Sequence, residues 1–120
     1  MILKFLKSKL HRATVTQSNL NYEGSITIDS ELMEMSDINE FEMVQVVNIN
    51  NGVRFETYAI RGESGSRIIG LNGAAARLGM EGDKVIIMTY CDLHSDEIKS
   101  HKPKIIVLDD DNNFKKEISR

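Results

Sequence analysis

The dipeptide Gly24-Ser25, just ahead of an apolar run that begins at Ile26, contains the residue types that allow a chain to cut its own backbone. A serine hydroxyl can attack the carbonyl carbon of the preceding residue and convert the amide into an ester. Elimination and hydrolysis of that ester leave a new N-terminal pyruvoyl group. Glycine and serine are also common turn residues, because glycine accepts positive φ and serine bonds to nearby backbone. As an isolated dipeptide, Gly24-Ser25 fits a turn better than a cleavage site.

The length and composition fit one compact domain over residues 1–120, since 41% of the residues are hydrophobic and no linker is evident. The net charge of -3 argues against a nucleic-acid-binding surface, which would need a concentrated basic face. The N-terminus is locally basic at Lys4, Lys7, Lys9 and Arg12. These charges fit the solvated edge of a strand or a site for an anionic small molecule equally well.

The single cysteine, Cys91, excludes an intrachain disulfide and suits a reducing compartment. The N-terminal residues do not form the apolar core of a secretion signal, and no segment approaches the roughly 18 apolar residues that span a bilayer. We therefore expect a soluble cytoplasmic protein with neither nucleic-acid nor membrane partners.

Short runs rich in β-branched residues, separated by glycine or asparagine, favour strands over helices. The predicted strands are 13–16, 25–28, 43–49, 54–60, 67–71, 84–90 and 104–108. Asn50-Asn51-Gly52 predicts a hairpin that pairs the strand before it with the strand after it. Residues 84–88 lack polar alternation, so we expect them to be buried on both sides.

Two short helices are expected among these strands. Asp29 or Ser30 can cap a helix that ends near Met35, and Asn72 can cap another over 73–78 that Gly79 ends. Residues 94–101 fit one helical turn, while the charged tail 109–120 is predicted to be loosely held. These elements indicate a mainly β protein, most simply a small closed β-barrel with short helices.

Five blocks of residues, taken together, resemble the bacterial aspartate 1-decarboxylase family in order and spacing. The resemblance extends from Met1 to about Met88, roughly three quarters of the chain. The blocks are Lys9-Leu10-His11-Arg12, Tyr22-Glu23-Gly24-Ser25, Asn51-Gly52-Val53-Arg54-Phe55-Glu56-Thr57-Tyr58-Ala59-Ile60, Gly65-Ser66-Arg67-Ile68-Ile69 and Asn72-Gly73-Ala74-Ala75-Ala76.

This resemblance implies a double-psi β-barrel that assembles as a homotetramer, with sites between subunits. It implies an inactive proenzyme that cleaves itself between Gly24 and Ser25 into a β chain, 1–24, and an α chain, 25–120. The family converts L-aspartate into β-alanine and carbon dioxide, and the β-alanine feeds the synthesis of pantothenate and coenzyme A.

Removing carbon dioxide from an α-amino acid leaves a carbanion that ordinary side chains do not stabilise. The resemblance implies that a pyruvoyl group derived from Ser25 supplies the electron sink, through a Schiff base with the substrate amine. Ser25 would first act as the nucleophile of the acyl shift and then provide the carbon skeleton of this group. Gly24 would allow a strained backbone that a Cβ would oppose.

Adjacent residues of one predicted strand carry two further implied roles. Thr57 would hydrogen-bond the Gly24 carbonyl oxygen during the acyl shift, although an ordinary strand threonine is the alternative. Tyr58 would return a proton to the carbanion, the alternative being a tyrosine at the rim of the core. Because neighbours on a strand face opposite sides, a twist, a bulge or a subunit boundary must bring both to one site.

The substrate-binding residues implied by the resemblance include two cations. Arg54 offers a planar pair of donors for a carboxylate, and Lys9 offers a compact positive charge. Neither cation is assigned to the α or the β carboxylate. Taken alone, each residue is more typical of a solvated surface. The remaining implied residues are Asn72, Gly73, Ala74, Ala75, Tyr22 and His11. Asn72 can also simply cap its helix. His11 has no companions at metal-binding spacing, so no metal is predicted.

Val47 departs from the family pattern, because well-studied members carry a tryptophan at the matching place beside the pocket. The smaller side chain leaves the pocket wider, and the chain after Met88 matches less well. Two alternatives therefore stay open: a self-processing decarboxylase for another amino acid, such as glutamate, and a barrel that only binds a ligand.

Overall fold

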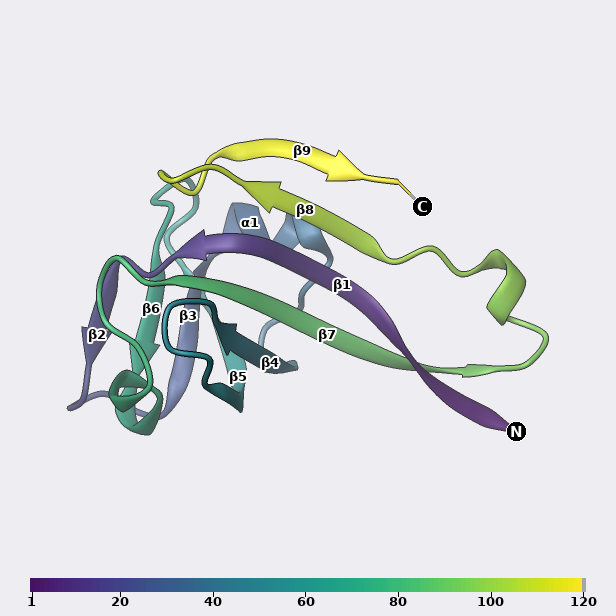
Figure 1. Cartoon of the computed structure of the whole chain (residues 1–120), viewed down its shortest axis with the longest axis horizontal. Helices are drawn as coiled ribbons and strands as arrows, with labels where there is room; N and C mark the ends of the chain where they lie inside the picture. The colour runs from purple at the N-terminus through teal and green to yellow at the C-terminus, as the bar shows by residue number, and fades with distance from the viewer. Residues whose placement is uncertain (120) are drawn as a thin grey trace.

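A computed structural model describes residues 1–119, whose nine strands form one mixed sheet in the order β2-β6-β3-β5-β4-β7-β1-β8-β9 (Figure 1). The strands are β1 (Ile2–Thr14), β2 (Gln17–Asn19), β3 (Ser25–Asp29), β4 (Met43–Asn48), β5 (Arg54–Gly62), β6 (Ile69–Asn72), β7 (Lys84–His94), β8 (Lys104–Leu108) and β9 (Phe114–Ile118). One α-helix, α1 (Ser30–Ser36), and two 3-10 helices, η1 (Gly73–Arg77) and η2 (Ile98–Ser100), accompany them. The predicted mainly β class with short helices is confirmed.

Alternating side chains of the central strands make the core. Val44 and Val46 on β4 and Val85 and Ile87 on β7 are fully buried. The hairpin predicted at Asn50-Asn51-Gly52 is also present: β4 and β5 pair antiparallel, and Gly52 takes a positive φ of 77°. Burial of one face of each strand is the ordinary way in which a sheet gains stability from apolar side chains.

The prediction that 84–88 is buried on both sides is wrong within this chain. Val85 and Ile87 face the core, whereas Ile86 and Met88 alternate with them and are only half-buried. The reason is that the second face of β7 lies outside the core of the single chain. That second face is nevertheless apolar at Ile86 and Met88.

The first strand is much longer than the predicted 13–16, because β1 begins at Ile2 and pairs with β7 antiparallel and with β8 parallel. Figure 1 shows β1 and β7 side by side, extending together beyond the body of the molecule to the N-terminus. Only Val15 and Thr16 separate β1 from β2, and their backbone N–H groups donate to the carbonyl oxygens of Asp83 and Ile69. One continuous segment therefore links two distant positions in the strand order.

The charged tail is not loosely held, contrary to the prediction for 109–120; Arg120 lies outside the described residues. β9 pairs antiparallel with β8, and Asn112 is buried in the turn between them. The Asn112 side chain accepts from the Thr14 backbone N–H at 2.7 Å and donates to the Thr14 and Arg67 carbonyl oxygens at 2.9 and 3.0 Å. These backbone contacts anchor a segment that its composition alone would leave free.

Asp29 ends β3 and caps α1. It is one of the two residues predicted to cap this helix. Its fully buried carboxylate accepts backbone N–H bonds from Glu31 at 2.8 Å, Gly65 at 3.0 Å and Arg67 at 2.7 Å. Burial acts to raise the pKa of Asp29, but these donors and the Arg67 charge outweigh it and lower the pKa overall. The C-terminal end of β3, the strand that begins at Ser25, is thus firmly held.

In residues 1–119 no helix is long and apolar enough to cross a membrane.

Candidate functional site

Ser25 is buried at the start of β3, directly opposite Asn72 at the end of β6. The Asn72 side-chain nitrogen donates to Ser25 Oγ at 3.0 Å and to Thr27 Oγ1 at 2.9 Å. Ser25 Oγ in turn donates to the Glu23 carbonyl oxygen at 3.1 Å. The Ser25 hydroxyl is therefore held against the backbone segment that precedes it.

Asn72 does not cap the helix that follows it. It stands at the N-cap position of η1, but its side chain makes no capping hydrogen bond. The short helix predicted over 73–78 is present as the 3-10 helix η1, and the Asn72 amide is directed to the two hydroxyls on β3. The predicted cap is therefore absent, and the Asn72 amide instead contacts the Ser25 hydroxyl.

Gly73, and not Gly24, is the glycine that the local geometry requires. A Cβ on Gly73 would lie 2.8 Å from the Gly24 Cα and from the Tyr22 carbonyl oxygen, and Gly73 has a φ of 63°. A Cβ on Gly24 would meet nothing within 4 Å, and the φ of Gly24 lies outside the left-handed region. The close approach of the two segments therefore depends on Gly73 and not on Gly24.

A pocket of about 250 Å³ opens beside this pair of strands. Its lining residues are Gln17, Asn19, Tyr22, Thr27 and Asn72. Two of them, Tyr22 and Asn72, belong to the predicted site. Of the nearby predicted residues, Ala74 is exposed and Ala75 is buried in η1. Thr27 was missed, although strand alternation places it on the same face as Ser25 and would have been the signal to find it.

Thr57 and Tyr58 lie next to this region on β5. β3 and β5 run parallel and pair from Ile26 with Ala59, so the residues just before this pair are Ser25 and Tyr58. Thr57 lies opposite the buried Val44, while Tyr58 lies opposite the exposed Met43. The two side chains face opposite sides as alternation requires, yet both line a hollow of about 260 Å³.

The predicted cations lie on a second surface, which we call the outer face: the side of β5, β4, β7 and β1 that points away from the core. Cross-strand pairing places Arg54 beside Val47 and Val47 beside Ile86. In the same way Met88 lies beside Lys9. Directly paired residues share one face of a sheet, so these side chains form a continuous surface that also includes Tyr58.

Within one chain, the structure does not bring Arg54 and Lys9 to Ser25. β5, β4 and β7 stand between β3 and Lys9 on β1, Arg54 begins β5 ahead of the residues that pair with β3, and neither cation lines the pocket beside Asn72. The candidate residues therefore form two groups: one around Ser25 and Asn72, and one on the outer face.

His11 lies on β1, where the pairing with β7 is irregular between Leu10 and Ala13. Its pKa is lowered from the usual 6.5, first by burial and then by the positive charges of Lys9 and Arg12. The imidazole is thus neutral at neutral pH and able to accept a hydrogen bond beside two cations.

We expect NMR titration of His11 to give a midpoint below 6.5. A lowered pKa in the folded state means that the unfolded chain binds the proton first, so this contribution to stability is complete above pH 6.5 and is lost as the pH falls through the folded pKa. Replacing Lys9 by methionine should raise the midpoint while leaving it below 6.5, since burial is the largest cause. A midpoint at or above that value in the unmodified chain would contradict the assignment.

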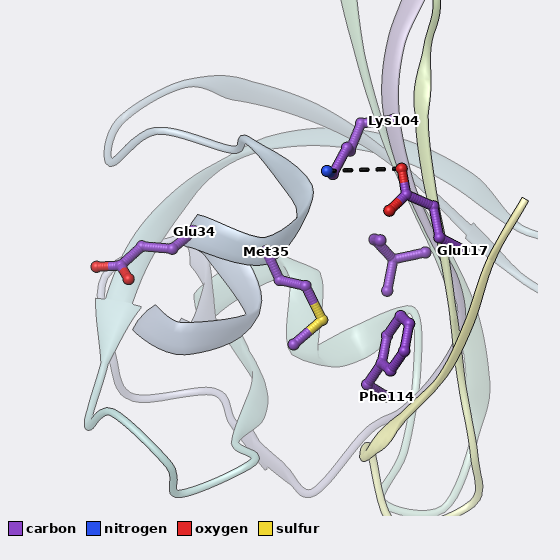
Figure 2. Close-up of a pocket in the computed structure, with 6 residues that line it drawn as sticks. Glu34, Met35, Lys104, Phe114 and Glu117 are labelled. Carbon is purple, nitrogen blue, oxygen red and sulfur yellow. Dashed lines mark ion pairs between the residues drawn. The ribbon is translucent and has the colours of Figure 1, made fainter. Parts of the chain in front are cut away.

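A separate groove of about 360 Å³ lies between α1 and the β8–β9 pair (Figure 2). Its floor contains Met35, Ile106 and Phe114, and Lys104 pairs with Glu117 at 3.5 Å across one side. Figure 2 shows Glu34 pointing away from this ion pair. The groove shares no lining residue with the predicted site.

Comparison with known proteins extends the resemblance beyond Met88. The family model described as aspartate decarboxylase matches residues 1–115. The aspartate 1-decarboxylase of Caldicellulosiruptor saccharolyticus is 66% identical over 116 residues, covering 97% of this chain and 91% of that relative. The aspartate 1-decarboxylase of Clostridium kluyveri is 62% identical over 114 residues, covering 95% and 90%. The match thus continues past Met88 over nearly the whole chain, and the chain belongs to the aspartate decarboxylase family.

Proposed function

We propose that this chain is an aspartate 1-decarboxylase, a lyase that converts L-aspartate into β-alanine and carbon dioxide for pantothenate synthesis. The observation that carries the proposal is the family membership over nearly the whole chain, together with the buried Ser25 hydroxyl held by Asn72. The ligand-binding barrel without activity is disfavoured, because these relatives are named for the enzyme. The single cysteine suits the cytoplasm as its location.

We further propose that the chain is made as a one-domain proenzyme, 1–120, which cuts itself between Gly24 and Ser25. Ser25 Oγ attacks the Gly24 carbonyl carbon, and the acyl group moves from nitrogen to oxygen. Elimination then removes the Cα proton of Ser25, breaks its Cβ–Oγ bond and releases Gly24 as a free carboxylate. Hydrolysis finally releases the α-nitrogen of residue 25 as ammonia and leaves the pyruvoyl carbonyl. In support, Ser25 Oγ already contacts the backbone of Glu23. Thr57 lies on β5 just before the residues that pair with β3, and we propose that its hydroxyl binds the developing oxyanion.

The residues around position 25 fit a pyruvoyl group. The side chain is buried, Asn72 presents an amide N–H to it, and Gly73 leaves room where a Cβ would collide with the Tyr22–Gly24 segment. Such a group supplies an electron sink for the decarboxylation. The pyruvoyl group and the substrate would be held by the Asn72 side chain and by the backbone groups of Gly73, Ala74 and Ala75. Tyr22 would line the site.

The outer face would bind and protonate the substrate. Arg54 and Lys9 would each attract a carboxylate, and the neutral His11 beside Lys9 would accept a hydrogen bond. Tyr58 would deliver a proton to the substrate carbon, as a tyrosine hydroxyl suits a strongly basic acceptor. Val47, beside Arg54, would leave space on this face, so glutamate remains a second substrate to compare.

We infer that these two groups of residues meet between chains of a homotetramer. The support is the outer face itself, where Val47, Ile86 and Met88 are only half-buried although their strands are strongly apolar. Covering this face with the Ser25 end of another copy would bury apolar side chains and complete a site that one chain leaves divided.

We also propose that the sheet closes as a double-psi β-barrel. The support is the continuous β1–β2 segment, which joins distant places in the strand order, together with parallel pairing of β3 with β5 and of β2 with β6. An experimental structure with strand connections of another type would overturn this point.

Intact mass spectrometry of purified protein tests the proenzyme. We expect fragments 1–24 and 25–120, the second carrying a pyruvoyl terminus that reacts with hydroxylamine, and β-alanine formation from L-aspartate. A full-length species that persists after prolonged warming and yields no β-alanine would overturn the proposed function. Comparing aspartate with glutamate in the same assay decides the substrate.

Mixing two inactive variants tests the shared site. Chains with Ser25→Ala lack the nucleophile and chains with Arg54→Ala lack the anion-binding group, so each alone should be nearly inactive. Co-expression should restore activity in about a quarter of the sites if a site combines Ser25 of one copy with Arg54 of another. Activity no higher than that of the two variants measured separately would place both residues in one chain.

A further inference from the structure

Arg54 is held by a neighbour on the outer face that has no role in the function proposed above. Gln45, on β4, pairs with Glu56 on β5 and with Met88 on β7, so it lies in the middle of this face. Its Oε1 accepts a hydrogen bond from Arg54 Nη2 at 3.3 Å and another from the Tyr90 hydroxyl at 2.7 Å. The sequence alone does not indicate these contacts, because they join residues of β4, β5 and β7.

The chemistry of the three groups permits one arrangement. A guanidinium only donates, so the Gln45 atom facing Arg54 must be the carbonyl oxygen and not the amide nitrogen. The same oxygen faces Tyr90, whose hydroxyl must then give its single proton to Gln45. The contact with Arg54 thus identifies the Gln45 atom that faces it as the oxygen, and the bond from Tyr90 holds Gln45 in that orientation.

An uncharged hydrogen-bond acceptor can orient an anion-binding arginine without neutralising its charge. A carboxylate at position 45 would pair with Arg54 and compete with the substrate, whereas an amide oxygen directs one N–H and leaves the positive charge available. The guanidinium has five N–H donors, so one bond to Gln45 leaves enough for a bidentate carboxylate. Val47, the residue paired with Arg54, has no polar group that could do this.

We propose that Gln45, held by Tyr90, is a positioning residue that orients Arg54 for a carboxylate of the substrate. The inference rests on the proposed role of Arg54. Arg54 is exposed on the single chain, and ordering a long free side chain costs entropy when the ligand binds. Gln45 would remove part of this cost beforehand, so it should act on substrate affinity and not on the chemical step.

The test compares Gln45→Met, which keeps the length of the side chain but removes the acceptor, with the unmodified processed enzyme. We expect KM for L-aspartate to rise about fivefold to tenfold while kcat stays within about twofold, as for the loss of one hydrogen bond to a charged group. The Kd of succinate, measured by calorimetry, should rise in parallel, because this dicarboxylate has no amine to react. Lys116→Ala, an exposed change on β9, serves as the control and should alter neither value.

Two further variants separate orientation from general damage. Gln45→Glu should raise KM and the succinate Kd through competition for Arg54, and Tyr90→Phe should raise both by less than Gln45→Met does. If Gln45→Met does not fold, these two variants carry the same test. Values equal to those of the unmodified enzyme in either of them would overturn the proposal.

A double-mutant cycle distinguishes failure of this inference from failure of the proposed function. In an Arg54→Ala background, Gln45→Met should have no further effect on the succinate Kd, because its partner is gone. If Arg54→Ala itself leaves KM and the Kd unchanged, Arg54 does not bind the substrate and the proposed role is wrong. If Arg54→Ala raises them but Gln45→Met does not, or if Gln45→Met has the same effect in both backgrounds, the positioning role is wrong.

Discussion

A Ser25→Ala chain is expected to remain a single polypeptide after prolonged warming and to form no β-alanine. Alanine has no hydroxyl to attack the Gly24 carbonyl and no oxygen through which an ester can form, so both self-cleavage and the catalytic group are lost together. Because Ser25 is buried and pairs with Asn72 through the β3–β6 ladder, the loss of one oxygen leaves the backbone pairing in place. Gel electrophoresis and intact mass measure the cleavage, and a β-alanine assay measures the activity.

The chain contains its own control for this experiment. Gly65-Ser66 is a second Gly-Ser dipeptide, but it lies in an exposed turn where Ser66 Oγ donates to the Glu63 carbonyl oxygen at 2.6 Å. We expect Ser66→Ala to cleave and to turn over like the unmodified chain. Formation of β-alanine by the Ser25→Ala chain would exclude the proposed mechanism. Cleavage of the unmodified chain between Gly65 and Ser66 would exclude it as well.

A Tyr58→Phe chain is expected to cleave normally but to lose turnover by a factor on the order of a hundred or more, the usual contribution of a general acid. Phenylalanine keeps the aromatic ring, whose centroid lies 6.3 Å from that of Phe41, so the packing is retained while the proton is removed. The kcat at saturating L-aspartate, divided by the fraction of cleaved chains, is the quantity to compare.

Phe41→Leu is the matched change for Tyr58→Phe, because it alters the ring contact and leaves the hydroxyl in place. It should retain most of the turnover. An unimpaired kcat in Tyr58→Phe would remove Tyr58 as the proton donor. An equal loss in both variants would assign the effect to packing of the two rings.

The strands that the sequence predicted correctly are those with apolar residues buried on one or both faces. Residues 104–108 form β8 with the predicted bounds, and the four strands from 25 to 71 agree within a few residues. β9 and most of β1 were missed because their charged residues lower the apolar content of the run. Both are strands because a neighbouring strand supplies hydrogen-bond partners, which local composition does not reveal.

In the candidate site, too, features set by the local sequence were predictable, and contacts between strands were not. The opposite orientations of Thr57 and Tyr58 were predictable, because alternation along a strand is a local property. The contacts of Asn72 with Ser25 and of Gln45 with Arg54 were not, because each depends on the register between strands. The helix cap expected of Asn72 was the local alternative, and the pairing of β6 with β3 prevailed over it.

The sequence by itself determined which reactive groups the chain carries, where its strands alternate, and to which family it belongs, since these depend on residue types and their spacing. It also contains two Gly-Ser pairs that are chemically alike. Only the tertiary structure decided that Ser25 is buried against the Asn72 amide while Ser66 lies in an exposed turn. The physical reason is that the burial of Ser25 and its contact with Asn72 come from strands distant in the sequence, whereas the Ser66 hydroxyl bonds within its own turn.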